Sequence, residues 1–163
     1  MKRAFILLLI LVCVRAVTAQ EPEIPKFLRN TLNSEFGSWK MAEIEQSIST
    51  YFKEKPGNQS PNFIKGDWNG DGMVDYALLV QRKSDSQKKM VLVFVKDRRG
   101  FKRFFLEGFD CLMLVKKGNT DYDFEAKKKF THKNDAIMSY IWEKSGTSYI
   151  WEKNRFRAVL ISD

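Results

Sequence analysis

Oxygen-bearing side chains occupy four of the five alternate positions of one short segment, 67–75, which reads Asp67-Trp68-Asn69-Gly70-Asp71-Gly72-Met73-Val74-Asp75. Calcium prefers oxygen ligands, and a loop of this kind can wrap around the ion where a glycine permits a sharp turn, here Gly72. Without a cation, three carboxylates held close together repel one another. The segment therefore predicts a calcium site whose ligands are Asp67, Asn69, Asp71, the backbone carbonyl of Met73, and Asp75.

The sequence after the loop distinguishes it from an EF-hand. An EF-hand carries a bidentate Glu at the twelfth loop position and a helix on each side, whereas the twelfth position here is Leu78, within the strand-like run 76–80. The loop is thus expected to join strands. Its two Xaa-Gly pairs are also ordinary turn dipeptides, so a metal-free hairpin loop is the alternative. Turn chemistry alone, however, does not require Asp67 and Asp75.

Residues 66–80 resemble the calcium-binding core of FG-GAP and VCBS-type repeats, which occur in integrin-like propellers and in many secreted bacterial proteins. The resemblance implies that the loop lies between neighbouring strands and that the five positions named above are its ligands. Propeller blades need neighbours to cover their faces, and the sequence contains no second Asp-x-Asn-x-Asp-Gly segment. A closed propeller within this chain is therefore not expected.

The N-terminus has the pattern of a secretory signal peptide. Lys2 and Arg3 precede an apolar run at 4–14, and the small residues within 17–19 suit cleavage before Gln20. Arg15 interrupts the apolar run before it reaches the ~20 residues of a membrane-spanning helix. We therefore expect a signal peptide at 1–19, a single domain at 20–163, a secreted or periplasmic location, and no membrane insertion after cleavage.

Charge and cysteine content narrow the classes of partner. The chain has 28 basic and 20 acidic residues, and the predicted leader removes Lys2, Arg3 and Arg15, so the mature chain has 25 basic residues and an excess of five. This bias is mild and no nucleic-acid motif accompanies it, so no nucleic-acid partner is expected. Cys111 is the only cysteine after the leader, which excludes an internal disulfide, and its apolar context predicts a buried thiol.

The remaining pattern predicts an α+β domain, with one or two N-terminal helices packed on an antiparallel β-meander of about six to eight strands. Apolar spacing places helices at 27–37 and 41–53, and the second helix is expected to cover the sheet. Strands are expected at 63–66, 75–81, 90–96, 101–106, 112–115, 136–143, 148–152 and 156–161. The strands at 75–81 and 90–96 are apolar at both parities, so both of their faces should be covered. The polar stretch 117–135 is expected to be a long loop or an exposed edge strand.

The pentapeptide Tyr-Ile-Trp-Glu-Lys occurs at 140–144 and again at 149–153, which predicts a hairpin with its turn at 145–148. This pairing places Trp142 opposite Trp151 and puts both on one face with Tyr140 and Tyr149. If that face is exposed, it is suited to binding a glycan or an exported protein. Packing of the same rings in the core is the alternative.

No pattern in the sequence predicts an enzyme. The single histidine, His132, lacks the spacing of a triad, nothing brings His132 and Cys111 together as a dyad, and motifs for a nucleophile elbow, a phosphate loop or a zinc site are missing. We expect a secreted or periplasmic, non-enzymatic domain with structural calcium in a strand-connecting loop. The alternative is a recognition module or inhibitor that uses the aromatic hairpin, and a hydrolase would need a second acidic cluster in a cleft.

Overall fold

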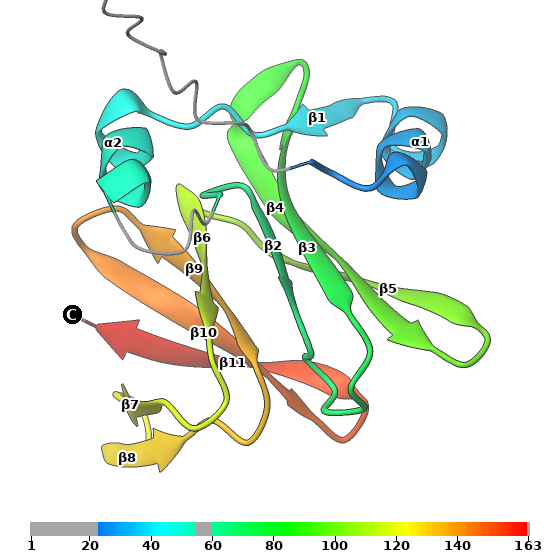
Figure 1. The fold of residues 1–163 in the computed structure, drawn as a ribbon. Coiled ribbons are helices and arrows are strands. Elements are labelled where there is room, and N and C mark those ends of the chain that lie inside the picture. The colour runs from blue at the N-terminus through cyan, green and yellow to red at the C-terminus, as the bar shows by residue number, and fades with distance from the viewer. Residues whose placement is uncertain (1–22, 55–59, 163) are drawn as a thin grey trace, which may run out of the picture.

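Two antiparallel β-sheets face each other in the computed structural model, which describes residues 23–54 and 60–162 (Figure 1). The first sheet contains β1 (Trp39–Met41), β2 (Phe63–Gly66), β3 (Asp75–Arg82), β4 (Asp85–Asp97) and β5 (Gly100–Glu107). The second contains β6 (Cys111–Val115), β9 (Ala136–Ile141), β10 (Ser145–Glu152) and β11 (Arg155–Ser162). The strands β7 (Thr120–Asp123) and β8 (Lys128–Thr131) form a third, two-stranded sheet, and the helices are α1 (Lys26–Glu35) and α2 (Gln46–Glu54).

The α+β class is confirmed, but the predicted number of strands was too low, because the described chain contains 11. The additional strands are short. They include β1, with three residues, and β7 and β8, with four each, which lie in the polar stretch that was expected to be a loop or an edge. Strands of this length show too little alternation to stand out in a sequence.

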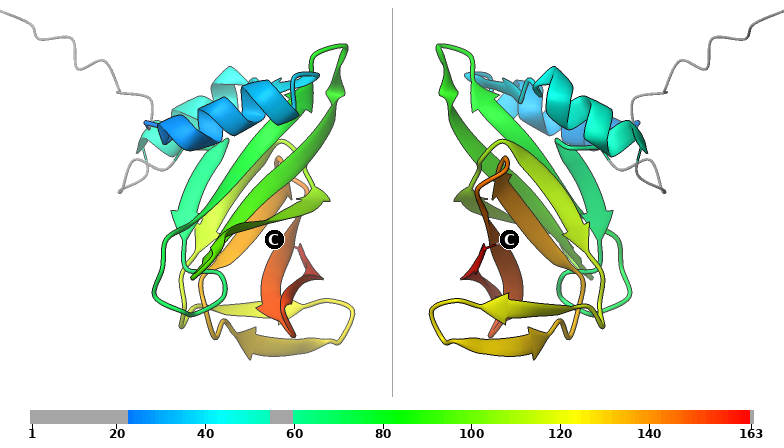
Figure 2. Two further views of the ribbon diagram at one scale, coloured as in Figure 1. Left: turned by 90° about the vertical axis from the view of Figure 1, so that its right-hand side faces the viewer. Right: turned by 90° about the vertical axis from the view of Figure 1, so that its left-hand side faces the viewer.

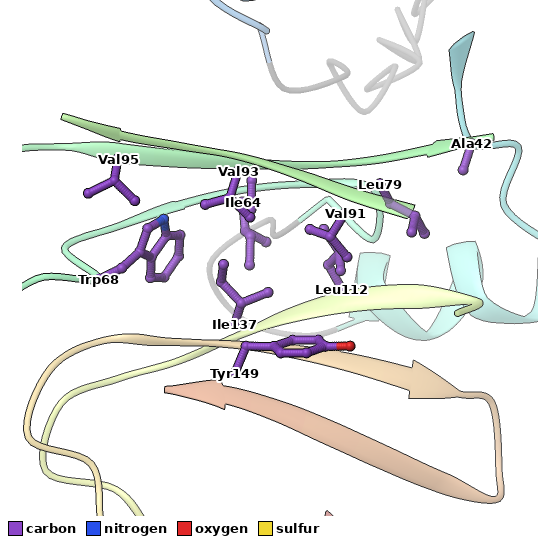
Figure 3. Close-up of a cluster of buried hydrophobic side chains, with 11 residues drawn as sticks. Ala42, Ile64, Trp68, Leu79, Val91, Val93, Val95, Leu112, Ile137 and Tyr149 are labelled. Atoms are coloured by element: carbon purple, nitrogen blue, oxygen red, sulfur yellow. The ribbon is translucent and has the colours of Figure 1, made fainter. Parts of the chain in front are cut away.

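The main core lies between the two large sheets (Figures 2 and 3). The strands β3 and β4 are apolar at both parities because they have a cover on each face, as predicted. One set of side chains, which includes Leu79 and Val91, packs against Leu112, Ile137 and Tyr149 of the second sheet. Folding of the meander into a second sheet thus supplies one of the two covers.

The other cover is α1, not the helix that was predicted at 41–53. Leu28 and Leu32 lie one turn apart in α1 and pack against the opposite face of the first sheet, beside Leu78 and Leu92. The helix α2 lies elsewhere, because its buried residues Ile48 and Phe52 pack with Cys111 of the second sheet. Figure 1 shows the two helices near the same end of the molecule but over different sheets.

The predicted helix also began too early. Its first residue, Met41, belongs to β1 and pairs with Val80, and the next residue, Ala42, donates its N–H to the carbonyl of Leu79 (2.9 Å). The spacing of Met41 and Ile44 suits a helix, but pairing with the edge of β3 satisfies the backbone groups of this segment instead.

The predicted hairpin in the C-terminal region has the wrong register. Ser145 pairs with Ile141, so the turn between β9 and β10 is at 142–144, and a second turn at 153–154 connects β10 to β11. Lys153 and Asn154 have φ values of 49° and 61°, as a two-residue hairpin turn of type I′ requires. Each copy of the pentapeptide therefore ends in its own turn, and the two copies do not pair with each other through a turn at 145–148.

Candidate metal-binding loop

The loop 67–75 joins β2 to β3, two neighbouring antiparallel strands that pair from Gly66 and Asp75 onward. This confirms the expectation that the loop connects strands and not helices. The antiparallel pairing brings the two ends of the loop together. The first predicted ligand, Asp67, follows Gly66, which pairs with the last predicted ligand, Asp75, so both lie at the same end of the β2–β3 pair.

Asp67 organises the first half of the loop through backbone hydrogen bonds. Its Oδ1 accepts the N–H groups of Gly70 (2.8 Å) and Asp71 (3.0 Å), and its Oδ2 accepts the N–H of Gly72 (2.9 Å). Gly70 and Gly72 both have positive φ, 77° and 81°, which is the left-handed conformation that glycine adopts without strain. The two glycines thus let the chain curl around the Asp67 carboxylate.

Asn69 and Asp71 each accept a backbone N–H from the residue two positions further on. The Oδ1 of Asn69 accepts from Asp71 (3.1 Å), and the Oδ1 of Asp71 accepts from Met73 (2.8 Å). The amide of Asn69 also donates to the Oδ2 of Asp71 (2.8 Å) and to the carbonyl of Lys96 in β4 (3.3 Å). A cation ligated by both residues would replace the contact between the Asn69 amide and the Asp71 carboxylate.

Asp75 is the buried member of the set, with a solvent exposure of 0%. Its two oxygens accept one N–H each, Oδ2 from Trp68 (2.8 Å) and Oδ1 from Lys96 (2.6 Å). Burial raises the pKa of Asp75 to about 6 against these two hydrogen bonds, and the charges of Asp71 and Asp67 raise it further. The three carboxylates of the loop therefore lie close enough to repel one another, which is the condition that a bound cation relieves.

Trp68 attaches the loop to the core. Its side chain is fully buried between the two sheets, where Figure 3 shows it beside Val95 and Ile64. The ring lies over Gly66, and a Cβ at that position would come within 2.4 Å of it. Trp68 therefore points into the core, while its neighbours Asp67 and Asn69 belong to the proposed set of oxygen ligands.

Two residues just before β9 of the second sheet also hold the loop, and no sequence pattern predicts their contacts. Asn134 donates to the carbonyl of Trp68 (3.1 Å), and Asp135 accepts the N–H of Asp67 (3.2 Å) through Oδ2. Asp135 in turn bonds the ammonium of Lys116 (3.0 Å) and the N–H of Lys117 (3.1 Å). Although burial acts in the opposite direction, these bonds hold the pKa of Asp135 below its usual range. The loop is therefore a junction between the two sheets.

The groups available to a metal are oxygen donors of mixed type. In residues 23–54 and 60–162, no group of three or more His, Cys, Asp or Glu side chains is arranged so that it could hold a metal ion. The loop would need its carboxylates to turn partly away from the backbone N–H groups, with Asn69 and the carbonyl of Met73 completing the shell. Each carboxylate has about four lone-pair positions, so an oxygen that accepts one N–H can still bind a cation.

Protein-family models, curated protein sequences and solved structures were compared with the chain. None of them matches it.

The four aromatic residues of the C-terminal repeat do not share a face. Tyr149 and Trp151 point into the core between the sheets, where Trp151 packs edge-to-face on Phe104 (5.2 Å between ring centroids). Tyr140 and Trp142 belong to the cluster around α2, and Trp142 contacts Tyr51 (5.0 Å). Since the two tryptophans lie near opposite ends of β10, about 20 Å apart at ~3.3 Å per residue, they do not form a common surface.

Cys111 and His132 lie in separate environments. Cys111 is fully buried against α2, as predicted, and burial raises the pKa of its thiol to about 12. The Nε2 of His132 bonds Asp121 (2.6 Å), and its ring packs on Phe130 (4.9 Å between centroids).

The described helices include none that is long and apolar enough to cross a membrane. The predicted leader at 1–19 lies outside the described residues.

Proposed function

We propose that this chain is a secreted or periplasmic, non-enzymatic protein whose loop 67–75 binds one calcium ion. The ligands are Asp67, Asn69, Asp71, the carbonyl of Met73, and Asp75. The observation that carries the proposal is the buried carboxylate of Asp75, which is held within electrostatic reach of two further carboxylates. A cation of hard character is the partner that stabilises such a group of oxygens.

The role proposed for the ion is structural. The loop contacts β4 through Lys96, and it contacts Asn134 and Asp135 in the segment that leads into β9 of the second sheet. A cation in the loop would therefore restrain the junction between the sheets. Trp68 is the only loop residue in the cores between and outside the sheets, and the strands and helices supply most of the other core residues, so the metal-free chain should still fold. A ligand that binds only the folded state then raises its stability by mass action.

Calorimetry on chelator-treated protein tests the binding. We expect one calcium site with affinity in the millimolar range or better, a rise in melting temperature with calcium, and a smaller rise with magnesium, which demands compact octahedral geometry. Protein that shows neither heat of binding nor a shift in melting temperature at millimolar calcium would exclude the proposal.

A matched pair of variants separates metal binding from turn geometry. Asp71→Ala removes a proposed ligand that also accepts the N–H two residues further on. Asp85→Ala removes an aspartate outside the loop that makes the same kind of bond, to the N–H of Gln87 (3.1 Å). We expect Asp71→Ala to weaken calcium binding at least tenfold and to keep the circular dichroism of the metal-free fold, whereas Asp85→Ala should bind calcium normally.

A further inference from the structure

The strand β5 is the outermost strand of the first sheet and pairs with β4, and no strand of residues 23–54 or 60–162 pairs with its other edge (Figure 1). The neighbouring strand shows which of its peptide groups face outward. Lys96 of β4 donates its N–H to Asp75 and accepts the amide of Asn69 with its carbonyl, so both groups point away from β5. Lys96 is in register with Phe101, and this pair is therefore one of the pairs without hydrogen bonds.

Alternation along an antiparallel strand then fixes the remaining groups. The odd-numbered residues of β5, namely Phe101, Arg103, Phe105 and Glu107, turn their N–H and C=O groups toward the free edge. The carbonyl of Glu107 fits this assignment, since it accepts the hydroxyl of Tyr149 (2.9 Å). In the described part of the chain, no hydrogen bond satisfies the outward peptide groups of Arg103 and Phe105.

The side chains at this edge favour contact with another strand. Phe105 is the most exposed of the large hydrophobic residues in the described chain, at 58%. Cationic residues usually protect a sheet edge from pairing. Here their charges are matched within the chain, because Lys102 pairs with Asp97 (3.2 Å) and Arg103 with Glu35 (2.9 Å).

We propose that β5 pairs antiparallel with β5 of a second copy of this chain, about a two-fold axis at Phe105. A two-fold contact joins the same surface of both copies, so each favourable pair occurs twice. In this register, Arg103 lies opposite Glu107 of the second copy, and the two Phe105 rings meet on the face of the sheet that carries α1, where each ring also contacts Phe36 of its own chain (5.9 Å between centroids). The register is selected by charge, since an axis at Arg103 would oppose two arginines, and an axis at Phe104 would leave Arg103 opposite Phe105.

Sedimentation measurements on the purified chain in chelator, which removes any effect of calcium, test this interface. We expect a concentration-dependent dimer that is weakened at least tenfold by Phe105→Lys and by Glu107→Arg. The control is Glu125→Arg, which makes the same charge change at an exposed site outside β5 and should leave the dimer intact. A chain that remains monomeric at about 1 mM, or a dimer that neither β5 variant weakens, overturns the proposal.

Cross-linking tests the register independently of stability. In a chain whose Cys13 and Cys111 are replaced by alanine, Phe105→Cys places two thiols at the axis, about 5.5 Å apart between Cα atoms, within the range of a disulfide. Arg103→Cys places them about 14 Å apart, at ~3.4 Å per residue, which is too far. Oxidation should join the copies through position 105 only, and equal cross-linking at position 103 would refute the register.

Discussion

The buried carboxylate of Asp75 predicts how the stability of the metal-free protein depends on pH. In the unfolded chain its pKa is 3.8, and in the folded chain burial raises it to about 6. Between these values the folded state binds more protons than the unfolded state, so stability must fall as pH rises from about 4 to 6.5. A shift of about two units corresponds to a loss of roughly 3 kcal/mol, at 1.36 kcal/mol per unit.

Urea melts in chelator across this range, on the wild type and on Asp75→Asn, measure the effect. Since asparagine cannot ionise, the variant should lack this loss, and the difference between the two proteins isolates Asp75 from other titrating groups, such as Asp135, whose lowered pKa acts in the opposite direction. The control is Asp85→Asn, an aspartate outside the loop, which should keep the wild-type slope. Calcium should offset the loss above pH 6, because it binds the ionised carboxylate. Equal slopes in the wild type and in Asp75→Asn would refute the reasoning.

Three further predictions follow from the packing of the described residues. Gly66→Ala should destabilise the fold by about 1–3 kcal/mol in a chemical melt, because its Cβ would approach the Trp68 ring to 2.4 Å. The control is Gly118→Ala, at a position with no neighbour within 4 Å, which should show only the strain of its positive φ. Alanine at Trp151 should cost about 3 kcal/mol, since the ring packs in the main core, and a loss below 1 kcal/mol would contradict that placement. Cys111 should react with a soluble alkylating reagent only as fast as the protein unfolds, and alkylation at the rate of a free thiol at neutral pH would show that the site is open.

The parts of the structure that could be predicted depend on local pattern. The loop 67–75 could be predicted because its oxygens, glycines and flanking strands all lie within residues 63–82. The strands β3 and β4 could be predicted because they are apolar at both parities. The contacts of Asn134 and Asp135 with the loop join residues that are 66 and 68 positions apart in the sequence, and a local sequence pattern cannot predict contacts over such separations.

The two main errors arose where a local pattern was compatible with two structures. Met41 and Ile44 have helical spacing, but residues 39–41 pair with residues 80–82 of β3 and form a strand instead. The repeated pentapeptide suggested a hairpin between its copies. Each copy instead ends at a turn that takes up positive φ at non-glycine residues, Glu143 in one and Lys153 with Asn154 in the other, which residue type alone does not reveal.

The span of the contact between Asp67 and Asp135 bears on the order of events in folding. The loop is complete only after the second sheet has docked, because 68 residues separate the donor from the acceptor, and closing such a distance is slow compared with forming a hairpin. An ion that binds the completed junction would stabilise the native state more than the transition state. Calcium should therefore act mainly on the unfolding rate and prolong the lifetime of the folded chain, with little change in the speed of folding.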